Sequence, residues 1–380
     1  MKVILSIDPI RYPLTGIGRY TYELARQLEG MPEISDLRYF GGSSFRAELP
    51  SASVGRAQAD GIRRRALKSR VAVGLYRLVA HRLKARTLRG FESYVFHGPN
   101  FYLPAFDGCN VLTVHDLSPY TWAHCHPPER VRYMQGEIER SLARARMLIT
   151  DSEFTRRELA DYFSWPIERI RAVPLASASE FHIRDSEELA PVLNLYGLAP
   201  GRYCLYAGTI EPRKNVSTLL DAYAALSPSV LRQWPLVLVG YEGWRSEEIH
   251  ARIREAQAEG WVRYLGFVPA DHLPVLYSGA RLFAFPSLYE GFGLPVLEAM
   301  ASGVPVVCSD SSSLPEVVGE AAATCSAKDV DTLAGLIARG LEDEVWRRDA
   351  IEKGLQRARC FSWQRCAQET VAAYRAAVQF

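Results

Sequence analysis

Short apolar runs alternate with amphipathic stretches along the chain. Apolar runs of three to five residues, too short for helices and rich in β-branched or aromatic side chains, occur at Val3–Ile7, Tyr94–Phe96, Val111–Val114 and Met147–Thr150. Between such runs lie stretches such as Arg19–Leu28, in which apolar residues recur at helical spacing. This alternation predicts strands that are followed by helices, which is typical of an α/β fold with parallel sheets.

The same alternation starts again after residue 200, so a second domain is expected there. Its strands are predicted at Tyr203–Ala207, Leu236–Val239, Arg263–Leu265, Leu282–Phe285 and Val304–Cys308. Residues 179–200 are mixed in character and interrupted by Pro and Gly, which predicts a linker. We therefore expect two doubly wound, Rossmann-like domains at 1–178 and 201–360, which face each other across a cleft, and a helical segment at 361–380.

The segment Pro286–Asp310 is the most informative βαβ unit. A loop that contains Gly291 and Gly293 leads from a predicted strand into a short helix, and a second strand follows. The backbone amides of Phe292, Gly293 and Leu294 would lie at the N-terminus of this helix. Unpaired amides and the helix dipole favour an anion at such a position.

Two carboxylates flank the expected anion site. Glu290 precedes the helix, and Glu298 is expected in its first turn. A ligand that carries both phosphate and hydroxyl groups would suit this mixture, because amides and cations bind the phosphate while carboxylates accept hydrogen bonds from hydroxyls. The pattern therefore indicates a sugar nucleotide. Alternatively, Glu298 interacts only with the helix dipole, and the residues alone favour neither interpretation.

Two adjacent cations, Arg213 and Lys214, follow the first predicted strand of the second domain. Gly208 and Thr209 stand at the end of that strand, and a helix is expected to begin near Asn215. The guanidinium group offers a bidentate fork and the ammonium group a point charge, which together suit a diphosphate. The alternative is an ordinary solvated pair on the surface.

Further candidate residues follow the predicted strands of the first domain, where ligands of parallel α/β sheets bind. The turn Gly16-Ile17-Gly18 could approach a phosphate with its amides, or be no more than a tight turn. Candidate polar side chains after two other strands are His97, Asn100, His115 and Asp116. A single histidine at a strand end is often structural, so both interpretations remain open.

The composition is that of a globular protein and excludes several classes. The chain has 380 residues, of which 48% are hydrophobic and 23% charged, and its net charge of +2 gives no indication of nucleic-acid binding. Its seven cysteines lack a C-x-x-C pair, so neither a disulfide framework nor a zinc site is expected. No apolar stretch approaches a membrane span, and the N-terminus reads as a strand rather than a signal peptide, so a cytoplasmic location is expected.

The segment Arg63–Arg89 departs from this average. It holds ten Lys and Arg residues and no acidic residue, while Leu67, Val71, Leu75 and Leu78 recur at helical spacing. A basic amphipathic helix of this kind would suit an anionic membrane surface or a lipid diphosphate. An ordinary surface helix with a solvated basic face is the alternative.

These motifs together resemble the retaining family 4 glycosyltransferases, which have the GT-B fold. Glu290-x7-Glu298, the segment Gly208–Asn215 and the turn Gly16-Ile17-Gly18 match the order and spacing of that family over nearly the full chain. Within the family, Leu112–Leu117 and Phe96–Asn100 resemble the mannosyl- and rhamnosyltransferases of bacterial O-antigen assembly.

The resemblance implies a role for each candidate residue. Arg213 and Lys214 would bind the donor diphosphate, the Gly16 and Gly18 amides would close over it, and His115 would approach the donor sugar. The other donor contacts implied are Glu290 with Phe292 and Gly293 at the sugar hydroxyls, Glu298 at the ribose, Phe267 and Val268 near the base, and Gly208, Thr209, Gly291 and Leu294 around them. The acceptor side is expected at His97, Asn100 and Asp116. In this fold the last helix, here 361–380, packs back on the first domain.

The function implied is transfer of mannose or D-rhamnose, with retention, from a GDP-sugar to a lipid-linked saccharide at the inner face of the cytoplasmic membrane. Neither a metal nor another cofactor is expected, since Arg213 and Lys214 supply the positive charge. The alternatives are a UDP-GlcNAc- or UDP-glucose-dependent enzyme, a nucleotide-sugar epimerase of the same fold, and a nucleotide-sugar-binding protein without activity.

Overall fold

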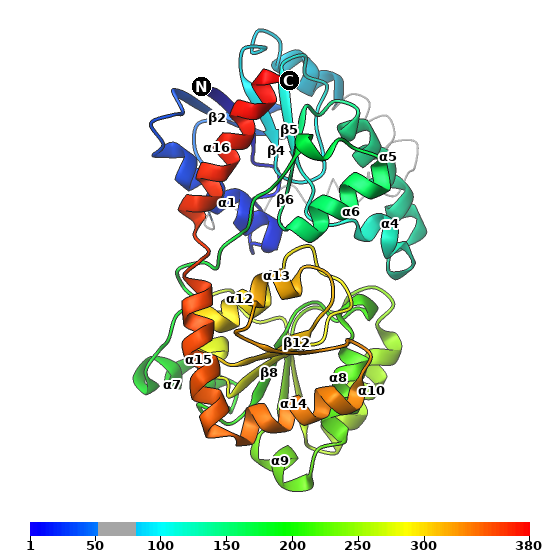
Figure 1. Cartoon of the computed structure of the whole chain (residues 1–380), viewed down its shortest axis with the longest axis vertical. Coiled ribbons are helices and arrows are strands. Elements are labelled where there is room, and N and C mark those ends of the chain that lie inside the picture. The colour runs from blue at the N-terminus through cyan, green and yellow to red at the C-terminus, as the bar shows by residue number, and fades with distance from the viewer. Residues whose placement is uncertain (52–80) are drawn as a thin grey trace.

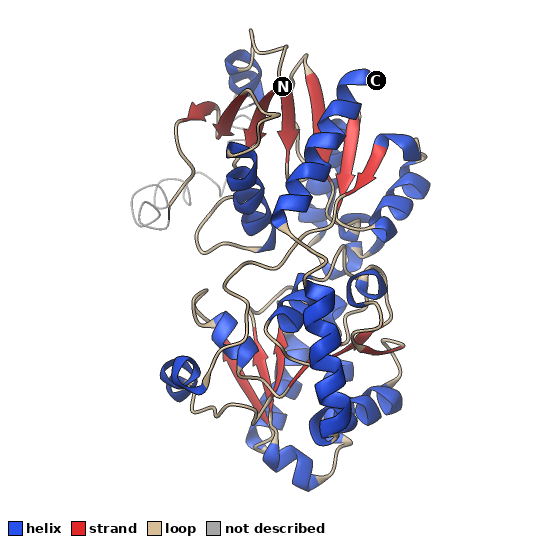
Figure 2. Cartoon of the chain, turned by 60° about the vertical axis from the view of Figure 1, so that its left-hand side comes forward, coloured by secondary structure: helices blue, strands red, loops and turns tan. Residues whose placement is uncertain are grey.

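The computed structural model describes residues 1–51 and 81–380, which form two α/β domains stacked end to end (Figure 1). Each domain has a central sheet with helices on both faces (Figure 2). The predicted fold class, two doubly wound domains, is confirmed.

The first domain contains a seven-stranded sheet in the order β3-β2-β1-β4-β5-β6-β7. All neighbouring strands in it are parallel except β2 and β3. The strands are β1 (Lys2–Ser6), β2 (Asp36–Gly41), β3 (Ser44–Arg46), β4 (Val95–Gly98), β5 (Cys109–Thr113), β6 (Met147–Thr150) and β7 (Ile170–Ala172). Strand order reverses at β1, so the carboxyl ends of β1 and β4 form the switch point at which ligands bind in such sheets.

Helices cover both faces of this sheet, and three of them, including the C-terminal helix with its cap Ser362, begin with side-chain caps. Thr15 caps α1 (Gly16–Glu29), and Ser152 caps α6 (Glu153–Phe163). The other described helices are α4 (Ser118–Thr121), α5 (Pro128–Leu142) and the C-terminal α16 (Trp363–Gln379), with 3-10 turns at Ala123–Cys125 and Ile167–Arg169.

The second domain contains a six-stranded parallel sheet in the order β10-β9-β8-β11-β12-β13. Its strands are β8 (Cys204–Ala207), β9 (Leu236–Val239), β10 (Val262–Gly266), β11 (Leu282–Phe285), β12 (Val306–Ser309) and β13 (Ala323–Cys325). Its helices are α7 (Ser186–Leu195), α8 (Val216–Ala224), α9 (Pro228–Gln233), α10 (Glu247–Ala258), α11 (Leu273–Ser278), α12 (Leu294–Ala301), α13 (Leu314–Val318), α14 (Val330–Glu342) and α15 (Glu344–Ala358). The switch point lies between β8 and β11. The turns that follow these two strands contain the candidate cations Arg213 and Lys214 and the carboxylate Glu290.

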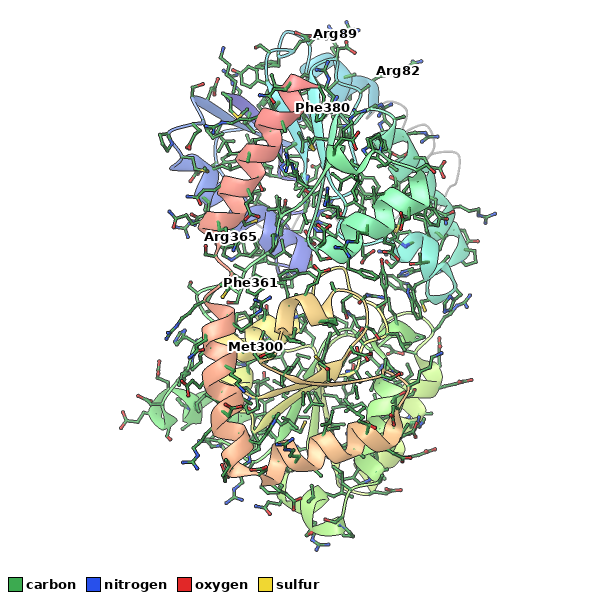
Figure 3. All side chains as sticks on the ribbon, viewed as in Figure 1. Arg82, Arg89, Met300, Phe361, Arg365 and Phe380 are labelled. Atoms are coloured by element: carbon green, nitrogen blue, oxygen red, sulfur yellow. The ribbon has the colours of Figure 1, made fainter. Side chains whose placement is uncertain are left out.

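The C-terminal helix α16 returns to the first domain, where it packs against α1, β5 and β6 (Figure 1). The chain passes between the domains at Phe361–Arg365 (Figure 3). Tyr374 of α16 is fully buried, and its hydroxyl lies 2.7 Å from Nδ1 of His97. The other ring nitrogen of His97 is 2.8 Å from Oγ1 of Thr113. A buried polar chain therefore accompanies the apolar packing of this helix.

The segment 179–200, predicted as a linker, contains the helix α7. Asp185 and Glu188 form a capping box at its start, and Leu189 and Leu193 are buried beside α11. The sequence pattern does not predict α7, because a proline inside a segment, here Pro191, argues against a helix. The pattern also fails to predict β2, β3 and β13, of which the last two have only three residues each.

Most of the basic segment Arg63–Arg89 lies outside the described residues. Arg82 and Arg89 stand at the end of the first domain that faces away from the second (Figure 3). Within residues 1–51 and 81–380, no helix combines the length and apolar character needed to cross a bilayer.

Candidate active site between the domains

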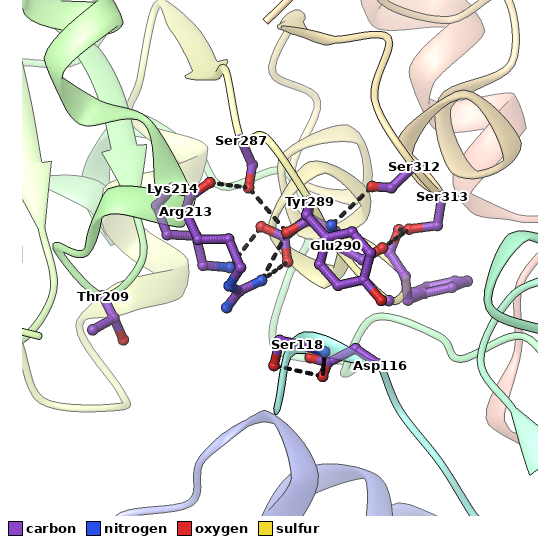
Figure 4. Close-up of polar contacts among 12 residues, drawn as sticks. Asp116, Ser118, Thr209, Arg213, Lys214, Ser287, Tyr289, Glu290, Ser312 and Ser313 are labelled. Atoms are coloured by element: carbon purple, nitrogen blue, oxygen red, sulfur yellow. Dashed lines mark hydrogen bonds and ion pairs between the residues drawn. The ribbon is translucent and has the colours of Figure 1, made fainter. Parts of the chain in front are cut away.

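Glu290 lies at the centre of the candidate site, in the loop that leads from β11 into α12. Its Oε1 atom is 2.6 Å from Nζ of Lys214, and its Oε2 atom is 3.6 Å from the guanidinium group of Arg213 (Figure 4). The three side chains are only 9–12% exposed. Because β8 and β11 are adjacent, the turns after them bring these three predicted residues together.

The charges in this cluster stabilise one another. Burial alone would raise the pKa of Glu290, but the cations Lys214 and Arg213 outweigh it and hold that pKa below its usual value. Burial likewise opposes the charged form of Arg213, while Glu290, Asp116 and Glu211 together raise its pKa. Glu211 also accepts a hydrogen bond of 2.7 Å from Nη2 of Arg213. The result is a preformed set of opposite charges that is shielded from water, where electrostatic interactions are strong.

Two serines at the start of α13 hold the loop of Glu290 in place. Oγ of Ser312 accepts a hydrogen bond from the Glu290 amide at 2.8 Å. Oγ of Ser313 lies 2.9 Å from the carbonyl oxygen of Glu290 and 2.7 Å from that of Phe292 (Figure 4). Because Ser313 is completely buried, these bonds fix the backbone on both sides of Gly291.

The N-terminus of α12 opens beside this loop. Gly293 is its N-cap, with φ +117°, a left-handed value that favours glycine. A Cβ atom at that position would also lie 2.7 Å from the side chain of Leu314. The first amides of α12, from Leu294 on, are therefore presented next to Glu290, as predicted for an anion-binding turn.

Glu298 is the fifth residue of α12 and not a member of its first turn, so the prediction of its position was wrong. A simple interaction with the helix dipole loses its basis, because the dipole acts within the first turn. Burial raises the pKa of Glu298 to about 7, although the charge of Arg19 and a hydrogen bond with Tyr277 act in the opposite direction. Since Arg19 belongs to α1, Glu298 lies where the first domain faces the second.

In the turn Gly16-Ile17-Gly18, only the first glycine lies close to the second domain. A Cβ atom at Gly16 would lie 3.9 Å from Cδ1 of Leu294, so the N-termini of α1 and α12 approach each other. The Gly18 amide instead donates to Oγ1 of Thr15 at 3.4 Å, and a Cβ atom there would be 3.0 Å from the carbonyl oxygen of Pro9. Gly16 is thus the member of the pair that can present its amide to a ligand.

His115 follows β5 and is held within the first domain by both ring nitrogens. Nδ1 lies 2.7 Å from Oδ2 of Asp151, and Nε2 lies 2.8 Å from the carbonyl oxygen of Pro99. Burial opposes protonation, but the charge of Asp151 and the two hydrogen bonds outweigh it and raise the pKa of His115. Both partners are acceptors, which favours an imidazolium that donates from both nitrogens.

Direct hydrogen bonds join the loop of Glu290 to the first domain. The hydroxyl of Tyr289 accepts from the Leu117 amide at 2.8 Å and donates to the carboxylate of Glu158. The carbonyl oxygen of Gly291 accepts from the hydroxyl of Ser152 at 2.7 Å. The residues on either side of Glu290 are therefore fixed by contacts with the opposite domain.

The predicted acceptor-side residues lie in different surroundings. Asp116 is bonded to Ser118 and faces the Arg213 cluster from the first domain (Figure 4). Asn100 lines a cavity in that domain. His97 is completely buried inside β4, and burial, reinforced by the charge of His115, lowers its pKa to about 3. The structure places His97 in the core, so its assignment to the acceptor side is not supported.

The remaining predicted donor residues follow strands of the second domain. Gly208 and Thr209 follow β8, and both are partly exposed. Phe267 follows β10, is 49% exposed and stacks on Tyr241 with ring centroids 4.8 Å apart. Val268 beside it is buried. Tyr241 and Phe267 together form an aromatic edge at the carboxyl ends of β9 and β10.

Several contributing residues escape sequence reasoning. Glu211 belongs to the same turn as Arg213, and an acidic residue two positions from a cation is a usable signal. Asp151 precedes the helix cap Ser152, and its carboxylate bonds His115. Tyr289 and Ser313 act through contacts between segments distant in sequence, for which the sequence carries no local signal.

The described residues include no group of three His, Cys, Asp or Glu side chains arranged to hold a metal ion. Asp329 in the sequence Asp329-Val330-Asp331 caps α14 by accepting a hydrogen bond from the Thr332 amide at 3.0 Å. Arg213 and Lys214 are the cations in contact with Glu290.

Comparison with known proteins identifies similar sequences and structures. Residues 199–357 match the family "Glycosyl transferases group 1". The chain is 44% identical over 383 residues to O-antigen chain mannosyltransferase B of Escherichia coli, with 99% of this chain and 100% of that protein covered. It is 32% identical to the serotype-specific mannosyltransferase WbdA of the same organism over 68% of this chain and 32% of that protein.

Solved structures share the fold at low identity. WaaG, a glycosyltransferase involved in lipopolysaccharide biosynthesis, has a TM-score of 0.69 at 16% identity, and 98% of each chain is covered. Anabaena HepE in complex with UDP-glucose has a TM-score of 0.70 at 17% identity, covering 99% of this chain and 100% of that one.

Proposed function

The chain belongs to family 4 of the glycosyltransferases, and on this basis we propose that it transfers a mannosyl residue from GDP-mannose to a growing O-antigen-type glycan. The observation that carries the proposal is the 44% identity to O-antigen chain mannosyltransferase B over nearly the entire length of both chains. The buried cluster of Arg213, Lys214 and Glu290 supports it, because two cations and a carboxylate at a switch point suit the diphosphate and the hydroxyl groups of a nucleotide sugar. GDP-D-rhamnose is the second candidate donor.

The charges suit cleavage of a sugar–phosphate bond. As the bond between the anomeric carbon and the diphosphate oxygen breaks, positive charge builds on the carbon and negative charge on the departing GDP. Arg213 and Lys214 would stabilise that GDP together with the amides at Gly16 and the start of α12, and in many enzymes preorganised groups of this kind contribute most of the rate enhancement. Glu290 would exchange its cation contacts for hydroxyls of the sugar.

We propose that the anomeric configuration is retained without a protein nucleophile. The acceptor oxygen would bond to the anomeric carbon on the face that GDP leaves, and the departing phosphate would take the acceptor's proton. The competing mechanism is double displacement with Glu290 as nucleophile. A glycosyl adduct on Glu290 of the wild-type enzyme, together with an inactive Glu290→Gln variant, would exclude our mechanism.

The donor is tested by thermal unfolding in the presence of GDP, UDP, ADP or dTDP, each with and without magnesium. A nucleotide at 100 times its Kd adds about 2.7 kcal/mol to the free energy of unfolding. Stabilisation by GDP alone, unchanged by magnesium, is the result expected for a GDP-sugar enzyme that needs no metal. Stabilisation by UDP alone would indicate that the donor is a UDP-sugar and not a GDP-sugar. No response to any nucleotide would favour a protein without this activity.

The acceptor is proposed to be lipid-linked and to be met at the inner face of the cytoplasmic membrane. The basic composition of Arg63–Arg89 supports this, because Lys and Arg clusters bind anionic lipid surfaces. Sedimentation with vesicles of phosphatidylcholine, with or without phosphatidylglycerol, tests the contact. Binding only to the anionic vesicles, lost at high salt, is expected, and equal binding to both would contradict it.

A further inference from the structure

The loop 240–246, between β9 and α10, is bonded to the turn that carries Arg213. The amide of Gly243 in this loop donates to the carbonyl oxygen of Ile210 at 2.9 Å. A Cβ atom at Gly243 would lie 3.0 Å from Cβ of Glu211, so the two segments are in close contact. Glu211 in turn accepts a hydrogen bond of 2.7 Å from Arg213. A displacement of the loop would therefore displace the turn of Arg213 with it.

Trp244 of this loop contacts two side chains of the first domain. The guanidinium carbon of Arg130, on α5, lies 4.3 Å from the centroid of the Trp244 ring, which is a cation–π contact. The ring of His126, just before α5, meets the same indole edge to face, with centroids 5.7 Å apart and an interplanar angle of 70°. Trp244 thus joins the loop of the second domain to the start of α5 in the first.

The backbone around Trp244 is fixed within the second domain. Arg245 has φ +55°, a left-handed value that a residue with a side chain keeps only where its surroundings determine it. Ser246 is completely buried, and its Oγ donates to the carbonyl oxygen of Gly243 at 2.8 Å. Because the loop is held in this way, the indole cannot follow α5 if the domains move apart. Separation of the domains would break its contacts with Arg130 and His126.

The contact is small enough to form and break reversibly. Arg130 is exposed and Trp244 is 40% exposed, and a cation–π pair at such a position changes an equilibrium constant by about two- to fivefold. His126 is buried, and neither of its ring nitrogens has a hydrogen-bond partner among the described residues. Burial lowers the pKa of His126, although the charge of Glu211 acts in the opposite direction. A neutral ring therefore packs on Trp244 and adds no hydrogen bond to it.

We propose that Trp244 is a positioning residue for the donor nucleotide. Docked on Arg130 and His126, it holds the turn of Arg213 against the first domain. The inference rests on the proposed function, in which GDP contacts the Gly16 amide of one domain and the cations of the other. Since the docked arrangement brings both sets of groups together, the apparent Kd is the intrinsic Kd divided by the docked fraction. Loss of the contact should therefore weaken binding without removing any group that touches GDP.

The test is a double-mutant cycle of Trp244→Ala and Arg130→Gln in the full chain. Calorimetric titration gives the Kd for GDP, and small-angle X-ray scattering gives the radius of gyration without nucleotide. Trp244→Phe keeps an aromatic ring, and Arg132→Gln, which changes a 74% exposed arginine on the same helix, is the matched control.

We expect each single variant of the cycle to raise the Kd by about two- to fivefold and to enlarge the radius of gyration. The double variant should bind GDP no more weakly than Trp244→Ala, because the contact is already lost there. Trp244→Phe should restore most of the affinity, and Arg132→Gln should match the wild type.

Three results would overturn the inference. They are an unchanged Kd in Trp244→Ala, effects of the two substitutions that multiply in the double variant, and radii of gyration equal to that of the wild type in both single variants. Unfolding temperatures identify a variant that fails to fold, and Arg130→Gln changes an exposed side chain, so it remains informative. A wild type that binds no GDP would contradict the donor assignment, whereas the radii test the docking of Trp244 whether or not GDP binds.

Discussion

A Cβ atom at position 291 would lie 1.9 Å from the carbonyl oxygen of His115, in the opposite domain. Gly291 follows the central carboxylate Glu290, and His115 follows β5. The requirement for glycine is one of space, since Gly291 is not among the glycines with positive φ. This close approach of two backbones sets the distance between Glu290 and the first domain.

Gly291→Ala is therefore expected to separate the two sides of the site while each domain keeps its core. A displacement of about 1 Å in a catalytic arrangement costs roughly 100-fold in rate, so we expect kcat/KM for transfer to fall by about that factor. The unfolding temperature should change little. Gly335→Ala is the control, because a Cβ atom there meets nothing within 4 Å. Unchanged transfer by Gly291→Ala would show that the contact is dispensable.

The pair of Lys214 and Glu290 is expected to behave as a buried ion pair in a double-mutant cycle. Lys214→Met leaves the Glu290 carboxylate buried with Arg213 alone, 3.6 Å away, and should cost about 3 kcal/mol of unfolding free energy. Adding Glu290→Gln should restore at least half of that stability, because the unpaired charge is removed. All three variants should lose transfer activity.

Chemical denaturation measures this coupling. The pair Lys353 and Asp349, which is 2.7 Å apart but at least half exposed, serves as the control, and no measurable coupling is expected there. A double variant no more stable than Lys214→Met would show that the two charges do not depend on each other.

The architecture is predictable from the sequence because the strands are short, apolar and fully buried. Leu236–Val239 and Leu282–Phe285 are confirmed to the residue, since a short apolar run rich in β-branched or aromatic side chains favours a buried strand. The pattern is less informative where burial is partial or a strong local signal misleads. α7 contains Pro191 and β13 has only three residues, so tertiary contacts rather than local pattern define both.

The candidate site is predictable where chemistry and spacing coincide within one turn. Arg213, Lys214 and Glu290 combine charge with a position at a strand end, and the structure brings them together. Neither the burial of His97 nor the partner of His115 has such a signal. His97 is bonded by Tyr374 of α16, and His115 is bonded by Asp151, which follows β6. Both partners are distant in the sequence from the histidine that they contact.

Glu298 should make stability depend on pH in a direction opposite to that of most carboxylates. Burial raises its folded-state pKa to about 7, above its value in the unfolded chain. The folded state therefore binds more protons between about pH 4.5 and 7, and stability falls as the pH rises through this range. Above pH 7 the ionised carboxylate costs up to about 3 kcal/mol.

Glu298→Gln should consequently be more stable than the wild type at pH 8 and similar to it at pH 4.5. The difference between the two proteins isolates this group, because the other titrating residues contribute equally to both. The variant should also bind GDP-mannose more weakly, if Glu298 accepts hydrogen bonds from the ribose. An identical pH dependence in the two proteins would mean that Glu298 titrates normally.

Tyr374→Phe is expected to loosen α16 without affecting the donor site. The variant leaves Nδ1 of His97 without its 2.7 Å partner in the core, which costs about 1–3 kcal/mol. Tyr162→Phe is the matched control, since Tyr162 is 52% exposed. The thermal shift caused by GDP should be the same in both variants. Equal unfolding free energies for the two variants would show that the buried bond contributes nothing.

Asp151→Asn tests whether the charge of His115 supports the site. In the wild type, Asp151 at 2.7 Å and the Pro99 carbonyl oxygen at 2.8 Å outweigh burial and raise the pKa of His115. A raised folded-state pKa contributes stability that is complete below about pH 6.5 and is lost as the pH rises through the folded value. Without the carboxylate, burial should dominate and hold the imidazole neutral, so this loss with rising pH should disappear.

The neutral ring has one N–H group and cannot donate to both partners, so the segment that carries the His115 carbonyl oxygen should lose its fixed position against Gly291. We therefore expect Asp151→Asn to reduce kcat by about tenfold or more while the thermal shift with GDP is retained, because Arg213 and Lys214 are untouched. An NMR titration of the His115 ring protons, compared between the two proteins, measures the cause directly. The same titration midpoint in both would show that Asp151 holds the ring by geometry alone, and a pH-independent loss of kcat would then be expected instead.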